Sequence, residues 1–501
     1  MKTLGLDIGS SSVKAAVMDT ETGECVASYT SPQTELPIDA PHPGWAEQAP
    51  ELWWEHVSIC MKELFGSGKV HAGEIAAIGI TYQMHGLVAL DASGVPLRPS
   101  IIWCDSRAVC IGEKAFREIG EARCLDSLLN SPGNFTASKL AWVKENEPDI
   151  FAKIDTFMLP GDYILYKLSG EKSTTESGLS EQILWDFRKN GFAGSVADYY
   201  GFAEKLVPEV KQNIGIQALT DAETEKRFGI KTGTPIAFRA GDQPNNAFSL
   251  NVLEPGEVAA TGGTSGVVYG VTDQRKADPQ SRVNTFLHVN HRGADPRYGV
   301  LLCINGTGIL NAWMKRLAAE DLSYEEVNQL AESVPAGSEG VVLLPFGNGA
   351  ERMLCNSYTG ATMAGVDLNR HGKAHILRAT QEGIAFAFRY GMDIMKGLGV
   401  DTRLIRAGKA NLFLSPLFRE TLATIADAKI ELYNTDGALG AARGAALGAG
   451  IYKTRQEAFA SLRKLEEITP NPAIKPALEE AYARWKAELD MHLTVACDGG
   501  K

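Results

Sequence analysis

The chain has 501 residues, of which 44% are hydrophobic and 22% are charged. This composition is typical of a globular protein, and the length exceeds what one ordinary hydrophobic core holds, so we expect at least two large domains. Acidic residues outnumber basic ones, 61 to 49, and the net charge of -12 argues against nucleic acid or an anionic membrane as a general partner.

The eight cysteines are scattered, with no CxxC pair and no histidines at metal-ligand spacing beside them. Scattered thiols are typical of a reducing compartment. No apolar run approaches the roughly 18 residues that a membrane span needs, and Asp7 interrupts the first apolar segment before a signal core can form. The sequence therefore predicts a cytoplasmic protein.

The chain begins with a predicted strand, a tight turn and a second strand. Residues 4–8 form an apolar run that contains Asp7, residues 9–12 read Gly-Ser-Ser-Ser, and residues 13–18 return as a strand. Consecutive backbone N–H groups in such a turn form a concave site for an anion. The structural alternative is an ordinary hairpin whose serines simply suit the turn.

Apolar residues at helical spacing then predict a helix within residues 47–65. Three apolar segments follow, at 75–80, 87–90 and 101–102, and each runs into polar residues. This pattern predicts an α/β sheet with a ligand-binding crevice at one edge. The first segment leads into Gln83-Met84-His85-Gly86, which offers an amide, an apolar wall and an imidazole to a polyol, although a structural histidine is the alternative.

The middle of the chain holds a carboxylate between an apolar strand and a helical segment. The strand ends in Gly241, Asp242 follows at once, and Pro244 opens the helix. Taken alone, this stretch favours an aspartate that caps the helix. We also expect the helix dipole to keep Asp242 ionised, which would make it a weaker base in any proton transfer.

Beyond Asp242 the pattern of the amino terminus recurs. Residues 258–261 lead into the turn Gly262-Gly263-Thr264-Ser265-Gly266 and return through residues 267–269. Two such turns predict a clamp that holds one polyphosphate from two lobes, and Lys14 adds a positive charge nearby. Neither turn is a Walker motif or a dinucleotide-binding fingerprint.

The remaining chain alternates between predicted strands and helices. A strand is expected at 341–346, and helices at 376–395, 437–448 and 473–493. The helix at 437–448 consists mostly of glycine and alanine, which favours close packing against a neighbour over chemistry.

Phosphoryl transfer needs charge neutralisation, in-line positioning and a group that accepts the proton of the attacking hydroxyl. Asp7 has the chemistry to hold Mg²⁺ through water, because Mg²⁺ favours one or two carboxylates together with phosphate oxygens. Asp242 has the chemistry to accept the proton. In this setting one residue can serve both as the helix cap and as the base.

An ordered set of motifs resembles the FGGY family of carbohydrate kinases over nearly the whole chain, and within it the xylulokinases. The motifs are residues 6–14, 45–54, 83–86, 97–107, 240–242, 263–266 and 437–442. The chain departs from the family pattern at 406–411, at Cys104, at Gln243-Pro244 and just after Glu351-Arg352. These departures concern the nucleotide and sugar contacts and leave Asp7 and Asp242 untouched.

The resemblance implies an α/β protein with two ribonuclease-H-like lobes of the actin and hexokinase type, residues 1–244 and 245–501, and an active site in the cleft between them. It implies ATP-dependent phosphorylation of a ketopentose, D-xylulose to D-xylulose 5-phosphate, with Mg²⁺ as cofactor, and a homodimer is a further expectation. The alternatives are a kinase for L-ribulose, L-fuculose or gluconate, a non-catalytic nucleotide-dependent sugar-binding protein, and an actin-like assembly ATPase.

The candidate site residues fall into four groups once the resemblance is considered. The base is Asp242 and the metal ligand is Asp7. The residues expected to bind the sugar are Gln83, Met84, His85 and Gln243. The residues expected to bind ATP are Ser10, Ser11, Lys14, Gly263, Thr264, Gly308, Gly408 and Asn411.

Overall fold

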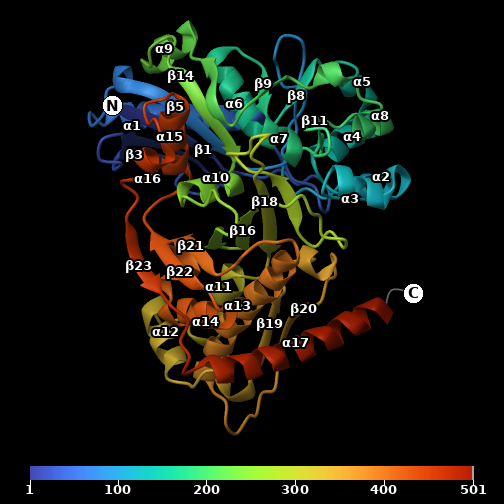
Figure 1. Ribbon diagram of the computed structural model, residues 1–501, viewed down its shortest axis with the longest axis vertical. Helices are drawn as coiled ribbons and strands as arrows, with labels where there is room; N and C mark the ends of the chain where they lie inside the picture. Colours follow the sequence, from blue (N-terminus) through green and yellow to red (C-terminus); the bar gives the residue numbers. More distant parts are fainter. Residues whose placement is uncertain (499–501) are drawn as a thin grey trace.

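The computed structural model describes residues 1–498, which form two α/β lobes stacked along the long axis of the molecule (Figure 1). The first lobe is built on a six-stranded sheet. Its strands, in spatial order, are β13 (Ile214–Leu219), β14 (Pro235–Gly241), β5 (Ile75–Tyr82), β1 (Lys2–Ile8), β2 (Val13–Asp19) and β3 (Cys25–Ser31). Strands β14, β5 and β1 run parallel, whereas β1, β2 and β3 form an antiparallel meander.

The three parallel strands are almost wholly buried. Strands covered on both faces read as continuous apolar runs, which is why the sequence shows no alternation there. Their register places Asp7 opposite Thr81, and Gly241 opposite Tyr82. All three strands therefore end at one edge of the sheet.

The second lobe is built on a seven-stranded sheet. Its strands, in spatial order, are β17 (Asn284–Leu287), β18 (Tyr298–Ile304), β16 (Gly266–Thr272), β15 (Val258–Gly262), β21 (Leu404–Gly408), β22 (Lys429–Tyr433) and β23 (Lys464–Ile468). The series β18-β16-β15-β21-β22 repeats the pairing directions of β3-β2-β1-β5-β14. The repeat noticed in the two hairpin turns is thus part of a repeat of whole sheets.

Helices cover both faces of the first sheet. α1 (Pro50–Gly66) packs on β2 and β3, and α15 (Gly437–Gly448) packs on β1, β5 and β14 from the opposite face. A Cβ added to Gly5 would lie 1.8 Å from the carbonyl oxygen of Ala438, and one added to Gly79 would lie 2.0 Å from that of Ala441. The close packing predicted for this helix of small residues is confirmed.

The position of α15 bears on the division of the chain into lobes. It lies within the predicted second segment, 245–501, and yet it sits on the sheet of the first lobe, beside β1 and β5 in Figure 1. α10 (Asp242–Ser249) lies between the two sheets, where it contacts α15, β5 and β14 on one side and β15 and β16 on the other. The division of the chain into two lobes at residue 244 therefore stays a prediction.

The helices of the second lobe surround its sheet. They are α11 (Gly308–Ala318), α12 (Tyr324–Glu332), α13 (Lys373–Gly397), α14 (Pro416–Ala426) and α17 (Lys475–Asp498). The short helix α16 (Arg455–Phe459) lies instead beside the first lobe, where it packs on α15 (Figure 1). α17 packs on β19 (Val342–Phe346), which pairs with β20 (Gly360–Ala364). Trp485 of α17 donates a hydrogen bond from Nε1 to the carbonyl oxygen of Leu343 at 3.0 Å. Within residues 1–498 no helix is long and apolar enough to span a bilayer.

Two predicted strands do not join the main sheet. Residues 88–90 form β6, which pairs with β8 (Thr156–Met158), and residues 100–101 form β7, which pairs with β4 (Glu47–Gln48). The expectation that they continue the sheet after β5 is wrong. A parallel neighbour needs a crossover of a dozen or more residues, and only a few residues separate β5 from β6.

Mostly helical segments fill the region between β7 and β13. Its helices are α2 (Val109–Ile119), α3 (Glu121–Ser127), α4 (Thr136–Asn146), α5 (Pro148–Phe151), α6 (Pro160–Ser169), α7 (Glu176–Glu181) and α8 (Gly194–Tyr200), and α9 (Ala222–Phe228) precedes β14. Short strand pairs join them: β9 (Ser173–Thr175) with β12 (Glu209–Lys211), and β10 (Trp185–Asp186) with β11 (Gly191–Phe192). This region packs a second apolar core against one end of the second sheet.

Candidate active site

Three parallel strands bring the predicted chemical groups to one edge of the first sheet. Asp7 is the next-to-last residue of β1, Met84 and His85 follow β5, and Asp242 directly follows β14. The backbone N–H of Gln83 donates to the carbonyl oxygen of Ile8 at 2.8 Å and extends the pairing past the last strand residue. Sequence reasoning placed these groups at strand ends, and the register of the sheet brings them together.

Asp242 is the first residue of α10, and the N-cap position belongs to Gly241. Hydrogen bonds from Gln243 lower the pKa of Asp242, but burial is the larger effect and raises that pKa to about 6. The expectation that the helix start would make Asp242 a weak base is therefore wrong. A buried carboxylate with a pKa near 6 is a stronger base than one at its ordinary value, because burial disfavours its charged form.

Asp7 is one of three carboxylates at this edge. Burial raises the pKa of Asp7 to about 7, with further contributions from the negative charges of Asp242 and Asp436, while Lys14 opposes them. The Lys14 ammonium lies 2.7 Å from Oδ2 of Asp436. One lysine thus faces three carboxylates, and this surplus of negative charge fits a divalent cation that also binds phosphate oxygens.

The end of α15 forms one wall beside Asp7. The side chain of Asp436 caps this helix by accepting from the backbone N–H of Leu439 at 3.0 Å. A Cβ added to Gly437 would lie 2.3 Å from Oδ2 of Asp7, so the backbone there is in close contact with the carboxylate. Within residues 1–498 no cluster of three His, Cys, Asp or Glu side chains has metal-binding geometry.

The turn after β1 has the tight geometry that the sequence predicted. The backbone N–H of Gly9 donates to the carbonyl oxygen of Ser12 at 3.0 Å. Two side chains from other segments hold Ser10: Nε2 of Gln48 donates to its carbonyl oxygen at 2.7 Å, and Nε1 of Trp103 donates to its hydroxyl at 3.2 Å. Sequence reasoning assigned no role to these two residues individually, although both lie within the motifs of the resemblance.

His85 has an unusual backbone and a fixed imidazole. Its φ of 62° lies in the left-handed region, and its N–H donates to Oε1 of Glu181 at 3.3 Å. Its Nδ1 lies 3.1 Å from the carbonyl oxygen of Glu181, and Nζ of Lys139 donates to the His85 carbonyl oxygen at 2.9 Å. Burial lowers the pKa of His85 to about 3, so the ring is neutral near pH 7.

The tautomer of His85 follows from these contacts. A carbonyl oxygen can only accept, so Nδ1 carries the proton and Nε2 is left as an acceptor. The ring lies against Phe135, with centroids 4.8 Å apart, and against Phe286 of the second lobe, with centroids 5.5 Å apart. Nε2 of His85 can therefore accept a hydrogen bond from a hydroxyl group.

Glu181 is a buried carboxyl group that sequence reasoning missed. Its side chain is 1% exposed, and burial raises its pKa well above the ordinary value. Oε2 has no hydrogen-bond partner among the described residues, and a Cβ added to Gly241 would lie 2.8 Å from it. This neutral carboxyl group thus lies against the residue before Asp242. No spacing in its segment marks it, because its partner His85 is 96 residues away.

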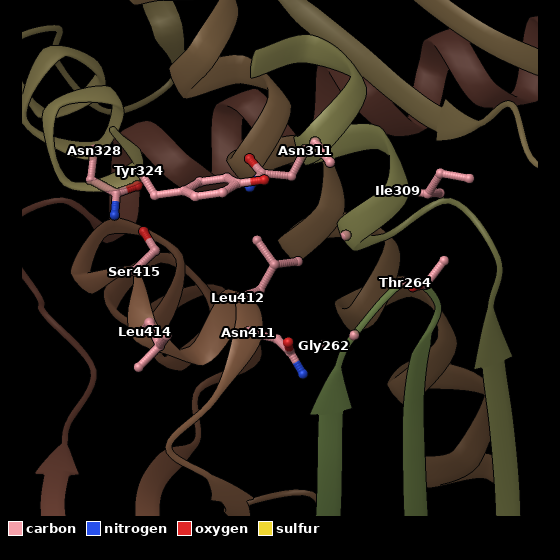
Figure 2. Close-up of a pocket in the computed structure, with 13 residues that line it drawn as sticks. Gly262, Thr264, Ile309, Asn311, Tyr324, Asn328, Asn411, Leu412, Leu414 and Ser415 are labelled. Atoms are coloured by element: carbon pink, nitrogen blue, oxygen red, sulfur yellow. The ribbon is translucent and has the colours of Figure 1, made fainter. Parts of the chain in front are cut away.

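A cavity of about 510 Å³ opens in the second lobe beside the turn between β15 and β16 (Figure 2). Four of the predicted nucleotide residues line it: Gly263, Thr264, Gly308 and Asn411. Gly308 donates its N–H to the carbonyl oxygen of Gly263 at 2.9 Å, and a Cβ at Gly308 would lie 2.3 Å from that oxygen. Of the other predicted ATP ligands, Gly408 ends β21 without lining this cavity, and Ser10, Ser11 and Lys14 belong to the first lobe.

The rest of the cavity wall was not anticipated. Figure 2 shows a ring and aliphatic side chains together with amides, and the additional lining residues are Ile309, Asn311, Ala312, Tyr324, Asn328, Leu412, Leu414 and Ser415, beside Gly262 of the predicted turn. Apolar side chains together with a few amides suit a flat heterocycle with polar edges. The spacing of Asn311 could have indicated its position on the cavity wall, because it follows Gly308 by about one helical turn and so lies on the same face of the helix.

Sequence models of known families match the chain in two parts. The N-terminal domain of the FGGY family of carbohydrate kinases matches residues 2–249, and the C-terminal domain of that family matches residues 258–451. The chain is 29% identical to the xylulose kinase of Escherichia coli K12 over 464 residues, which are 92% of each protein. It is 28% identical to the L-xylulose/3-keto-L-gulonate kinase of the same organism over 515 residues, 99% of this chain and 97% of that protein.

Solved structures share both lobes. The xylulose kinase of Rhodospirillum rubrum is 26% identical, with a TM-score of 0.86 over 98% of this chain and 99% of that one. The Plasmodium falciparum glycerol kinase with ADP has the same fold at 20% identity, with a TM-score of 0.86 over 98% of each chain. These structures confirm the predicted two-lobed α/β fold, and together with the two domain matches they show that the chain belongs to the FGGY family of carbohydrate kinases.

Proposed function

We propose that the chain transfers the γ-phosphoryl group of ATP to D-xylulose, giving D-xylulose 5-phosphate and ADP. The observation that carries this proposal is the position of Asp242, a buried carboxylate with a raised pKa, at the sheet edge that also holds Asp7 and His85. Several relatives at 28–29% identity are named xylulose kinase, which favours this sugar.

Asp242 accepts the proton of the attacking hydroxyl in this proposal. The hydroxyl oxygen forms a bond to the γ-phosphorus in line with the breaking bond to ADP, and the proton passes to the carboxylate. In a loose transition state the proton leaves late, so the base need only be ionised and correctly placed. A pKa of about 6 leaves Asp242 mostly ionised near pH 7.

Polar groups around Asp242 suit a polyol. His85 offers Nε2 as an acceptor, and the buried Oε1 of Gln243 has no hydrogen-bond partner among the described residues. Met84 supplies an apolar surface beside Gly241. A site with buried polar groups discriminates strongly, because a sugar that lacks the matching hydroxyl leaves them unpaired. Gln83 donates from Nε2 to Oε1 of Gln48 at 3.3 Å, so we assign it to the support of this wall.

Asp7 is the residue that would hold Mg²⁺, together with phosphate oxygens and water. When bound, the ion would neutralise charge on the phosphates. The turn at Ser10 and Ser11 presents backbone N–H groups for phosphate, and the cavity beside Thr264, Gly308 and Asn411 would take the adenosine. Lys14 is paired with Asp436, so its contribution to phosphate binding requires that pair to be shared or broken.

A coupled assay of ADP release tests the proposal. The substrates are D-xylulose, L-xylulose, L-ribulose, L-fuculose, gluconate and 3-keto-L-gulonate, the last two because relatives carry these names. Asp242→Asn should abolish sugar-stimulated ADP release while nucleotide binding persists. Near-normal turnover by this variant would show that Asp242 is not the base.

Each rival function has its own result in the same assay. If another sugar is preferred, the substrate assignment changes and the proposed mechanism stays the same. Tight sugar binding without ADP release by the wild type would favour a binding protein, and sugar-independent hydrolysis with filament formation would favour an assembly ATPase. The predicted homodimer and cytoplasmic location remain proposals.

A further inference from the structure

One arginine of the second lobe reaches into the first lobe beside the sugar-binding element. Arg352 begins η4 (Arg352–Leu354), and its Cζ lies 5.7 Å from the centroid of the Phe135 ring, just before α4. Phe135 in turn packs on His85 with centroids 4.8 Å apart. The guanidinium and the imidazole therefore share one aromatic neighbour, and the charge of Arg352 contributes to the low pKa of His85.

Arg352 has no anionic partner among the residues that the structure describes. Within residues 1–498 its guanidinium makes no hydrogen bond or ion pair, although it is only partly exposed and burial lowers its pKa. Arg107 provides the contrast: it also stacks on an aromatic ring, that of Trp45, but it pairs with Asp105 and Glu47. Removing a charge from water without a partner is unfavourable, and a bound anion would offset that unfavourable term.

The residue before Arg352 connects the same segment to the nucleotide cavity. The Glu351 carboxyl group is 1% exposed and accepts from the backbone N–H of Asn305 at 2.9 Å and of Gly306 at 3.2 Å. These residues form the turn that leads into Gly308, which lines the cavity. Two adjacent side chains thus contact the turn before the nucleotide cavity and the aromatic ring beside His85.

We propose that Arg352 binds the phosphoryl group during transfer and then the phosphate of the sugar phosphate product. This inference rests on the proposed kinase function. A guanidinium presents a planar fork of donors that matches two phosphate oxygens and stays charged throughout. As the bond from phosphorus to ADP breaks and the bond to the sugar oxygen forms, Arg352 only donates hydrogen bonds, and the proton goes to Asp242.

The test compares Arg352→Met and Arg352→Lys with the wild type in the full chain. Loss of a donor that acts on the developing charge typically lowers kcat by about 100- to 1000-fold, and we expect that loss for Arg352→Met with the KM for the sugar changed less than about threefold. Arg352→Lys should retain part of the rate, and added guanidinium ion should partly restore Arg352→Met. Arg370→Met is the matched control, because Arg370 pairs with Glu339 on the surface.

Calorimetry with D-xylulose and with D-xylulose 5-phosphate separates the possible ligands. Arg352→Met should weaken binding of the phosphate ester by about tenfold or more, as expected for a lost charge-assisted hydrogen bond, and leave binding of the free sugar unchanged. Equal loss for both ligands, or loss confined to a sugar acid such as gluconate, would assign Arg352 to the sugar and overturn the inference.

The remaining outcomes distinguish the two proposals. An active wild type whose Arg352→Met variant keeps normal kcat and normal affinity for the phosphate ester refutes the role of Arg352 alone. A wild type that releases no ADP with any sugar refutes the kinase proposal, and the phosphate-ester titration still reports on Arg352. Circular dichroism and nucleotide binding establish that each variant is folded.

Discussion

The carboxyl group of Glu181 accepts the backbone N–H of His85, and the carbonyl oxygen of the same glutamate accepts the His85 imidazole. One residue therefore fixes both the left-handed backbone of His85 and the tautomer of its ring. Because burial keeps the Glu181 carboxyl group neutral, a neutral amide of the same shape can replace it.

We expect Glu181→Gln to retain near-normal kinetics, because the amide oxygen still accepts from the His85 N–H. Glu181→Leu leaves that buried donor unpaired, which is unfavourable by about 1–3 kcal/mol and should raise the KM for the sugar more than it lowers kcat. Steady-state kinetics with each substrate varied separately measure the difference. If both variants behave alike, the hydrogen bond to His85 does not position the sugar wall.

The pH dependence of the reaction should report Asp242. The base must be ionised, and burial raises its pKa to about 6, so kcat/KM should fall tenfold per pH unit below about pH 6 rather than below pH 4. The measurement is kcat/KM for the sugar between pH 5 and pH 8, from about one unit below to about two units above the expected midpoint. A rate that stays level down to about pH 5 would contradict the assignment.

Asp7 should make Mg²⁺ binding dependent on pH. Its pKa is raised to about 7, so protons compete with the ion below that pH and the ion binds more tightly above it. The measurement is the thermal unfolding of the protein with ATP and increasing Mg²⁺, at pH 6 and at pH 8, which lie about one unit below and above the pKa of Asp7. Mg²⁺ should raise the unfolding temperature more at pH 8 than at pH 6.

Asp7→Asn provides the matched comparison. It keeps the shape of the side chain and removes the charge, so the difference between the two pH values should disappear while ATP alone still stabilises the protein. Asp19→Asn, a change at the end of β2 where the side chain accepts from the Glu21 N–H of the next turn, should leave the difference intact. An unchanged pH dependence in Asp7→Asn would move the metal site elsewhere.

The contact between Gly308 and Gly263 predicts a selective effect on the nucleotide. In Gly308→Ala the new Cβ would lie 2.3 Å from the Gly263 carbonyl oxygen, so the turn must shift. Such overpacking is unfavourable by about 1–3 kcal/mol, and we expect the KM for ATP to rise more than the KM for the sugar. Gly293→Ala is the control, since nothing lies within 4 Å of a Cβ there.

Local sequence patterns predicted the parts of the site that depend on neighbouring residues in the chain. Asp7 was found because it interrupts an apolar run, Asp242 because it directly follows one, and the two glycine-containing turns because they separate paired strands. The helix of small residues, α15, was likewise visible from its composition. These features depend on a few consecutive residues, which is why one sequence was sufficient.

Other parts depend on contacts between distant segments. Glu181 and Lys139 meet His85 from a region with no informative spacing, and they are 96 and 54 residues away from it. The raised pKa of Asp242 is a result of burial by several segments, whereas the sequence shows only the nearby helix start. Residues near Asp242 in the chain therefore could not show that burial affects its pKa more strongly than the helix dipole does.

The packing of α15 on the first sheet also has a consequence for how the protein is made. The strands β1 and β5 are synthesised early, but the helix that covers one of their faces begins only at Gly437. A nascent chain thus exposes this apolar face until nearly nine-tenths of its length has left the ribosome, which makes chaperone protection during translation valuable. Because Gly437 also lies against Asp7, the packing of this helix also completes the sheet edge that holds Asp7 and Asp242.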